Sequence, residues 1–143
     1  MSAEPIVIDA TLALSWCFAD EATTYSQGVL AALRQRHAVV PSTWFFDVIS
    51  MLVNAQRHQR IHAAGVEAFL QHLRRLPIRI DYSPRKQDLA AHFSAAQRLV
   101  LTPYNLAYLD LARSHGLSLA TLDDGLRAAA RVTSVKLLEV ALG

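Results

Sequence analysis

The chain has 143 residues, of which 52% are hydrophobic and 18% are charged, and one hydrophobic core is sufficient to stabilise a single domain of this length, residues 1–143. Its 14 basic and 12 acidic side chains leave a formal net charge of +2, which permits a nucleic-acid partner without requiring one. Asp9 interrupts the most apolar N-terminal stretch, and no run approaches the roughly 18 apolar residues that cross a bilayer. The composition therefore argues against both a membrane-spanning protein and a disordered chain.

The chain contains one cysteine, Cys17, which excludes an intrachain disulfide bond and a metal site built from several thiolates. Cys17 stands between Trp16 and Phe18 in an apolar run, so we expect a packed thiol rather than a nucleophile. A lone free thiol fits a reducing cytoplasm, and a cytoplasmic location is what we expect for this protein.

The hydrophobic pattern predicts short strands that alternate with helices along the whole chain. Runs of β-branched residues predict strands, and apolar residues at helical spacing predict the helices between them. Pro103 directly after Thr102 is typical of a helix start, because it places proline next to an N-cap residue. In chain order we predict a strand at 6–8, a helical turn at 12–18 capped by Thr11, a helix within 21–37, a strand at 38–40, a helix from 42 or 43 to about 57, a helix at 64–76, a strand at 78–80, a helix at 84–99, a helix at 103–116, a strand at 117–121, a helix at 123–131 and a candidate fifth strand at 135–138.

This order of elements predicts the fold class. Strands that are separated by helical stretches of ten residues or more pair in parallel through right-handed crossovers. We therefore predict an α/β protein, a three-layer α/β/α sandwich with a short parallel sheet. In such sheets the functional crevice lies at the carboxyl ends of the strands.

Acidic residues stand at the predicted carboxyl ends of two strands. Asp9 follows the first strand, and Asp123, with Asp124 beside it, follows the fourth. Two carboxylates at one sheet edge repel each other unless a cation or a basic residue lies between them. Asp47 lies about one turn into an apolar helix, where an isolated charge also needs a partner. Each acid alone would serve as a helix cap or favour a helix start, but together they predict a cation site.

The ligand types indicate which cation this is. Carboxylate oxygens without clustered cysteine or histidine favour Mg²⁺ or Mn²⁺ over zinc. Such a site suits phosphodiester hydrolysis, because the metal activates water and stabilises charge on the leaving oxygen. An Asp-x-Asp phosphotransferase would need an acid at Thr11, and the five glycines form no phosphate-binding loop.

Four segments of the chain resemble, in order and spacing, the motifs of PIN domains, especially the VapC-type toxins of bacterial toxin–antitoxin pairs. The segments are VIDATLALSW (7–16), PSTWFFDV (41–48), LTPYNLAYL (101–109) and LATLD (119–123). The resemblance extends over nearly the whole chain. It implies a PIN-like fold, a Mg²⁺- or Mn²⁺-dependent endoribonuclease acting on RNA, a cognate antitoxin that covers the acidic cleft, and a homodimer.

Carried over position by position, the resemblance assigns Asp9 and Asp123 to the family's acids, with Thr11 and Thr121 as hydroxyl groups that hold an acid or a water. Two positions depart from the family pattern. They are Asp47, where the family usually has Glu, and Asn105, where it has Asp. The catalytic and metal-ligating candidates are thus Asp9, Asp47, Asn105 and Asp123, and Asp124 is a further metal-ligating candidate.

Asn105 leaves three interpretations open. An amide keeps one carbonyl oxygen but removes a full negative charge, so it should weaken metal binding. The chain is then an engineered inactive variant, a naturally weakened enzyme, or a catalytically degenerate module that binds an antitoxin or RNA. The sequence does not identify the RNA target.

Overall fold

The computed structural model describes residues 3–83 and 88–140. Within these residues the sheet consists of β1 (Ile6–Ile8), β2 (Ala38–Pro41), β3 (Ile78–Asp81) and β4 (Ser118–Ala120). All neighbouring strands are parallel, in the order β3-β2-β1-β4. Because parallel neighbours cannot be joined by a hairpin, helices connect the strands.

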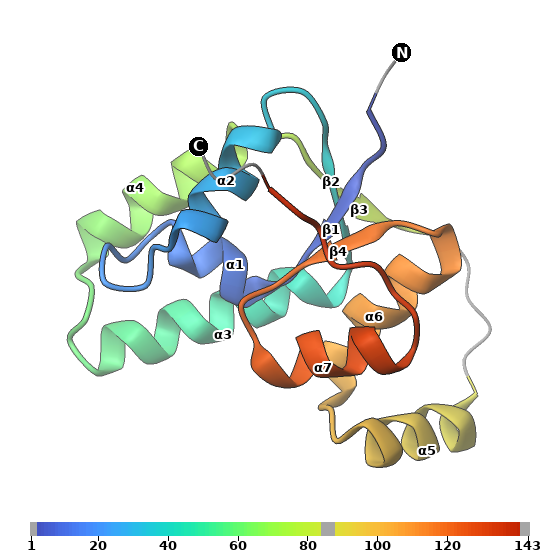
Figure 1. Cartoon of the computed structure of the whole chain (residues 1–143). Helices are drawn as coiled ribbons and strands as arrows, with labels where there is room; N and C mark the ends of the chain where they lie inside the picture. The colour runs from blue at the N-terminus through green and yellow to red at the C-terminus, as the bar shows by residue number, and fades with distance from the viewer. Residues whose placement is uncertain (1–2, 84–87, 141–143) are drawn as a thin grey trace.

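Helices cover both faces of this sheet (Figure 1). Helix α6 contacts β1, β2 and β4 and packs against α7, while α1, α2 and α4 are grouped on the opposite side. The predicted three-layer α/β/α sandwich is therefore confirmed. The helices are α1 (Ala10–Ser15), α2 (Thr24–Ala32), α3 (Thr43–Arg57), α4 (Ala63–Arg74), α5 (Leu89–Leu99), α6 (Pro103–His115) and α7 (Asp124–Val132).

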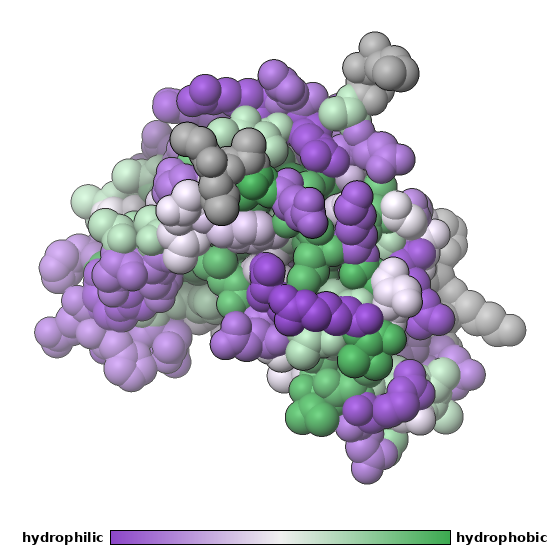
Figure 2. Space-filling model, viewed as in Figure 1, coloured by the Kyte–Doolittle hydropathy of each residue, from purple (hydrophilic) through white to green (hydrophobic). Residues whose placement is uncertain are grey.

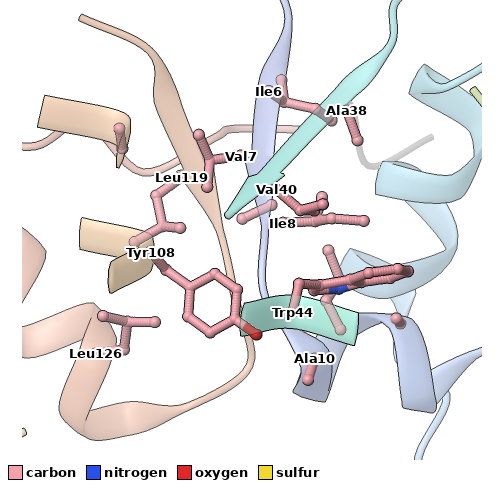
Figure 3. Packing of buried hydrophobic residues seen from close by; sticks show 14 of the residues in the cluster. Ile6, Val7, Ile8, Ala10, Ala38, Val40, Trp44, Tyr108, Leu119 and Leu126 are labelled. Carbon is pink, nitrogen blue, oxygen red and sulfur yellow. The ribbon is translucent and has the colours of Figure 1, made fainter. Parts of the chain in front are cut away.

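The core is built around β1, whose three residues are completely buried. Successive side chains of a strand point to opposite faces. Figure 3 accordingly shows Val7 beside Leu119 and Tyr108, whereas Ile8 lies beside Trp44 across the sheet. Burial on both faces explains why this strand appears in the sequence as a continuous apolar run.

Short polar side chains define the starts of two helices. The cap of α1 is Asp9 rather than Thr11, because Asp9 Oδ1 accepts the backbone N–H of Leu12 at 3.0 Å. Helix α2 lies within the predicted range 21–37 and begins at Thr24, since Thr23 and Ser26 cap it reciprocally. In both cases a short polar side chain satisfies free N–H groups of the first turn and so sets the boundary.

The predicted helix start at Pro84 lies outside the described residues. The described helix α5 begins at Leu89 and is capped by Asp88. The candidate fifth strand is reduced to one bridge between Leu119 and Leu137. By contrast, α6 begins as predicted with Thr102 as N-cap, and it ends at Gly116, whose φ of 62° favours glycine.

The molecular surface mixes charged and apolar areas. Figure 2 shows hydrophobic surface where Figure 1 places α7 and the turn between α5 and α6. Among the large side chains that are well exposed in this half of the chain are Leu89, Phe93, Val100 and Val132. None of the described helices combines the length and the hydrophobicity needed to span a membrane.

Cys17 is partly buried and packs against the core, which confirms the prediction of a packed thiol. Burial, with a smaller effect of the Glu21 carboxylate, raises the pKa of the thiol. Because the thiolate is the nucleophilic form, this environment makes Cys17 poorly reactive.

Candidate active site

The acidic residues at the carboxyl edge of the sheet are joined by hydrogen bonds. Asp9 directly follows β1, and Asp123 follows β4, which pairs with β1 in parallel. The two strands therefore deliver both acids to the same edge. Helices α3 and α7 begin below this edge in the view of Figure 1.

Asp9 is the most enclosed acid of the site, with a side chain that is only 1% exposed. Its Oδ1 accepts the Leu12 backbone N–H at 3.0 Å, and Thr11 Oγ1 lies 2.9 and 2.8 Å from its two oxygens. The hydroxyl of Thr121 donates to Oδ2. Because each hydroxyl supplies one proton, three donors occupy a carboxylate that has about four acceptor positions. One position is left for a cation or a water.

This environment raises the pKa of Asp9 from 3.8 to about 6. Burial is the largest cause, and the nearby Asp123 carboxylate raises the pKa further. The hydrogen bonds from Thr121, Leu12 and Thr11 lower it, because they favour the charged form. At neutral pH the Asp9 carboxylate is thus ionised, although its buried environment disfavours the charged form.

Asp123 is fixed from two directions. Its backbone N–H donates to Thr121 Oγ1 at 3.0 Å, and its Oδ2 accepts the Leu126 N–H at 2.8 Å as the cap of α7. A Cβ on Gly125 would lie 3.3 Å from Oδ2, so the glycine leaves room at this carboxylate. Both acids therefore act as helix caps, and they also lie close enough for the charge of Asp123 to raise the pKa of Asp9. A capping role and a role in a charged site are compatible.

The two threonines tie the strand ends together. Thr121 is completely buried, donates to Asp9 and accepts from Asp123. Thr11 donates to Asp9 and accepts the Leu122 backbone N–H at 3.3 Å. The resemblance names both hydroxyl groups as site residues, and both contact Asp9.

Asp47 has a partner that sequence reasoning missed. The Tyr108 hydroxyl donates to Asp47 Oδ2 at 2.8 Å, although the tyrosine is 1% exposed. Burial raises the pKa of Tyr108, followed by the charges of Asp47 and, more weakly, Asp9. The hydroxyl therefore keeps its proton and remains a donor. A buried tyrosine usually has a hydrogen-bond partner, and this was the available signal.

Asn105 and Asp124 are less closely connected to this network. The backbone N–H of Asn105 donates to Thr102 Oγ1 at 3.1 Å in the first turn of α6. Tyr108 is three positions after Asn105, so both lie on one side of the helix. Asp124 is exposed at the first position of α7.

The oxygen ligands fit a hard cation, but they are few. Among residues 3–83 and 88–140, no three Asp, Glu, His or Cys side chains lie close enough to hold a metal ion together. The structure brings Asp9 near Asp123, whereas Asp47 is hydrogen-bonded to Tyr108. Mg²⁺ is commonly held by one or two carboxylates and completed by water. The residues therefore fit one such ion better than two.

A separate hollow of about 600 Å³ lies over the other half of the same edge. It extends from the ends of β2 and β3, at Pro41 and Asp81, to the first turn of α6 at Pro103. Its lining contains none of the acids predicted for the site. The carboxyl edge is thus divided into an acidic half over β1 and β4 and an open half over β2 and β3.

Comparison with known proteins supports the fold. No protein-family model matches the sequence, and no curated protein matches it. The structure is similar to the crystal structure of PAE2754 from Pyrobaculum aerophilum, with a TM-score of 0.65 and 18% sequence identity. The match covers 89% of this chain and 87% of that chain. At this identity the likeness concerns the fold alone.

Proposed function

We propose that the protein is a metal-dependent endoribonuclease, the toxin of a toxin–antitoxin pair, which hydrolyses RNA phosphodiester bonds at the edge formed by Asp9 and Asp123. The observation that carries this proposal is the buried Asp9 carboxylate, whose pKa the charge of the nearby Asp123 carboxylate raises further. In the described part of the chain, no ion pair with Lys, Arg or His involves either acid. A cation is the partner that this pair lacks.

The surrounding residues prepare the pair for this task. Thr11, Thr121 and the Leu12 amide keep Asp9 charged and fixed in orientation, and preorganised ligands bind metal more tightly. Bound Mg²⁺ or Mn²⁺ would activate water and stabilise charge on the leaving oxygen. Arg127, which donates to the Thr121 carbonyl at 3.0 Å, brings a positive charge to the same edge for the RNA backbone.

The second candidate function is a binding module without catalysis, and Asn105 is the observation that favours it. Among residues 3–83 and 88–140, no third acidic side chain joins Asp9 and Asp123 closely enough to hold a metal ion with them. An amide at position 105 removes one negative charge from the helix that carries Tyr108. In this case the fold would sequester an antitoxin or an RNA without cleaving it.

The proposed partners follow from the toxin interpretation. We expect a cytoplasmic homodimer whose acidic edge is covered by a cognate antitoxin. The exposed apolar residues Leu89, Phe93, Val100 and Val132 provide surface for such contacts. A short neighbouring gene that encodes a basic DNA-binding head and an amphipathic tail would support the toxin pair, and light scattering would measure the oligomeric state.

The decisive experiment compares RNA cleavage by the chain, by Asn105→Asp and by the double variant Asp9→Asn/Asn105→Asp. Mixed single-stranded RNA is incubated with each protein in Mn²⁺ or in EDTA. Asp88→Asn is the matched control, because Asp88 also caps a helix but lies outside the acidic pair. We expect Mn²⁺-dependent cleavage by Asn105→Asp, little by the unaltered chain, and none after Asp9→Asn.

Each outcome discriminates between the two functions. Undiminished cleavage by the double variant would contradict the assignment of the site to Asp9. Absence of cleavage by Asn105→Asp over several RNAs, together with retained RNA or antitoxin binding, would favour the binding module.

A further inference from the structure

Arg127 is a partly buried arginine that two groups hold at the carboxyl edge of the sheet. One guanidinium nitrogen donates to the Thr121 carbonyl at 3.0 Å, and the guanidinium carbon lies 5.2 Å from the centre of the Tyr25 ring. The same threonine donates its hydroxyl to Asp9 and accepts the backbone N–H of Asp123. Arg127 is therefore fixed through the residue that connects the two acids.

Tyr25 is itself fixed, and it lies near both the guanidinium and the acidic pair. Its hydroxyl donates to the Leu138 carbonyl at 2.8 Å. Burial raises the pKa of Tyr25, Arg127 lowers it, and the charge of Asp9 raises it more weakly. A cation over an aromatic face is attracted by the electrons of the ring. The ring of Tyr25 therefore restricts the positions that the guanidinium can take.

A second arginine of the chain shows what Arg127 lacks. Arg60 lies 4.2 Å from the centre of the Phe18 ring. It also forms ion pairs with Asp20 and Glu21, at 3.2 and 3.1 Å. In the part of the chain that the structure describes, Arg127 forms no ion pair with a carboxylate. Its charge is thus fixed and partly removed from water without an anionic partner, and an anion of a ligand would supply one.

We propose that Arg127 forms a phosphate-binding site for RNA, which takes a phosphate next to the one that is hydrolysed. This inference rests on the proposed function, because it concerns the same edge and the same substrate. Since Arg127 forms no ion pair with Asp9 or Asp123, it lies beside the acids and reaches a neighbouring phosphate. The planar guanidinium can donate two parallel hydrogen bonds to phosphate oxygens. A guanidinium that is already held in place loses little freedom on binding.

The test measures RNA binding by fluorescence anisotropy of a labelled single-stranded RNA at several salt concentrations. All proteins carry Asp9→Asn, so that binding is observed without cleavage. Arg127→Gln removes the charge, whereas Arg127→Lys keeps the charge and loses the planar fork. The matched control is Arg36→Gln. Arg36 also donates to a backbone carbonyl, that of Glu4 at 2.8 Å, but it precedes β2 and lies at the opposite edge of the sheet.

We expect Arg127→Gln to weaken RNA binding about 10-fold. It should also lower the slope of log Kd against log salt concentration by about 0.7, the value for one phosphate contact of a single strand. Arg127→Lys should keep the slope and recover part of the affinity, and Arg36→Gln should change neither. A purely structural arginine would alter the melting temperature and leave the salt slope unchanged, so the slope discriminates between the two roles.

The failures of the two proposals are distinguishable. Unchanged affinity and slope in a folded Arg127→Gln variant would overturn the phosphate site and leave the nuclease proposal intact. So would a polyglutamate peptide that binds more tightly than the RNA and depends on Arg127, because the site would then suit an acidic protein partner. No RNA binding by any variant, together with no cleavage by Asn105→Asp, would overturn both proposals.

Melting temperatures establish that each variant is folded before its affinity is compared. If Arg127→Gln does not fold, the test depends on Arg127→Lys, for which the full affinity of the parent protein would overturn the proposal.

Discussion

Removing the charge of Asp9 is expected to stabilise the fold at neutral pH. The pKa of Asp9 lies at about 6 in the folded protein, against 3.8 for an unperturbed carboxyl. The folded state therefore binds the proton more tightly than the unfolded state, and stability falls as pH rises from about 4 to about 6. At about 1.36 kcal/mol per pH unit, the ionised carboxylate lowers the free energy of unfolding by about 3 kcal/mol at neutral pH.

Asp9→Asn removes this titration and keeps an oxygen for the Leu12 N–H. Its amide fits the Thr121 hydroxyl less well, which costs about 1 kcal/mol at any pH. We therefore compare urea unfolding of the two proteins at about pH 4 and about pH 7.5, without metal. The stability of Asp9→Asn relative to the unaltered chain should rise by about 2 to 3 kcal/mol between these pH values.

The pH dependence separates this explanation from a general loss of packing. A constant difference between the two proteins would mean that Asp9 titrates like an exposed carboxyl. A difference that changes in the opposite direction would mean that a positive group stabilises the charged form, and either result would refute the electrostatic account of the site.

Three further predictions concern Asn105, Thr121 and Cys17. Mn²⁺ should raise the melting temperature of Asn105→Asp more than that of the unaltered chain, since a metal at about 100 times its Kd stabilises the folded state by about 2.7 kcal/mol. EDTA should abolish this increase, and calorimetry measures the melting temperatures. Thr121→Val removes one of the donors to Asp9 and leaves the Asp123 N–H without its acceptor, so urea unfolding should show a loss of about 1 to 3 kcal/mol; an unchanged midpoint would contradict the bridging role. Cys17 should react with iodoacetamide more slowly than free cysteine at neutral pH, because burial raises its thiol pKa; mass spectrometry follows the labelling, and an equal rate would disprove this.

The sheet could be predicted from the sequence because its central strand is apolar at every position. Ile6, Val7 and Ile8 are buried on both faces, so composition alone identifies them as a strand. The sequence left both Asp9 and Thr11 as candidate caps of α1, since both are good capping residues, and the structure selects Asp9. Their roles were decided by Thr121, which is 112 residues from Asp9 in the chain and gives its hydroxyl to the aspartate.

The acidic site was only partly accessible to sequence reasoning. The strand-end rule places Asp9 and Asp123 at one edge, and the structure brings them together. Tyr108 was missed because an aromatic residue at helical spacing predicts core packing and not a hydrogen bond. Its acceptor is 61 residues away in the chain, and no local sequence pattern predicts a hydrogen bond over that separation.

The pairing of β4 with β1 has a consequence for the chain during its synthesis. Asp9 precedes Thr121 by 112 residues in the chain, so it is made long before the hydroxyl of Thr121 and the carboxylate of Asp123. A nascent chain that has completed β1, β2 and β3 still lacks the strand that carries them. The acidic edge therefore forms only after β4 and the residues that follow it have left the ribosome, and fragments that end before residue 118 carry Asp9 without its counterpart.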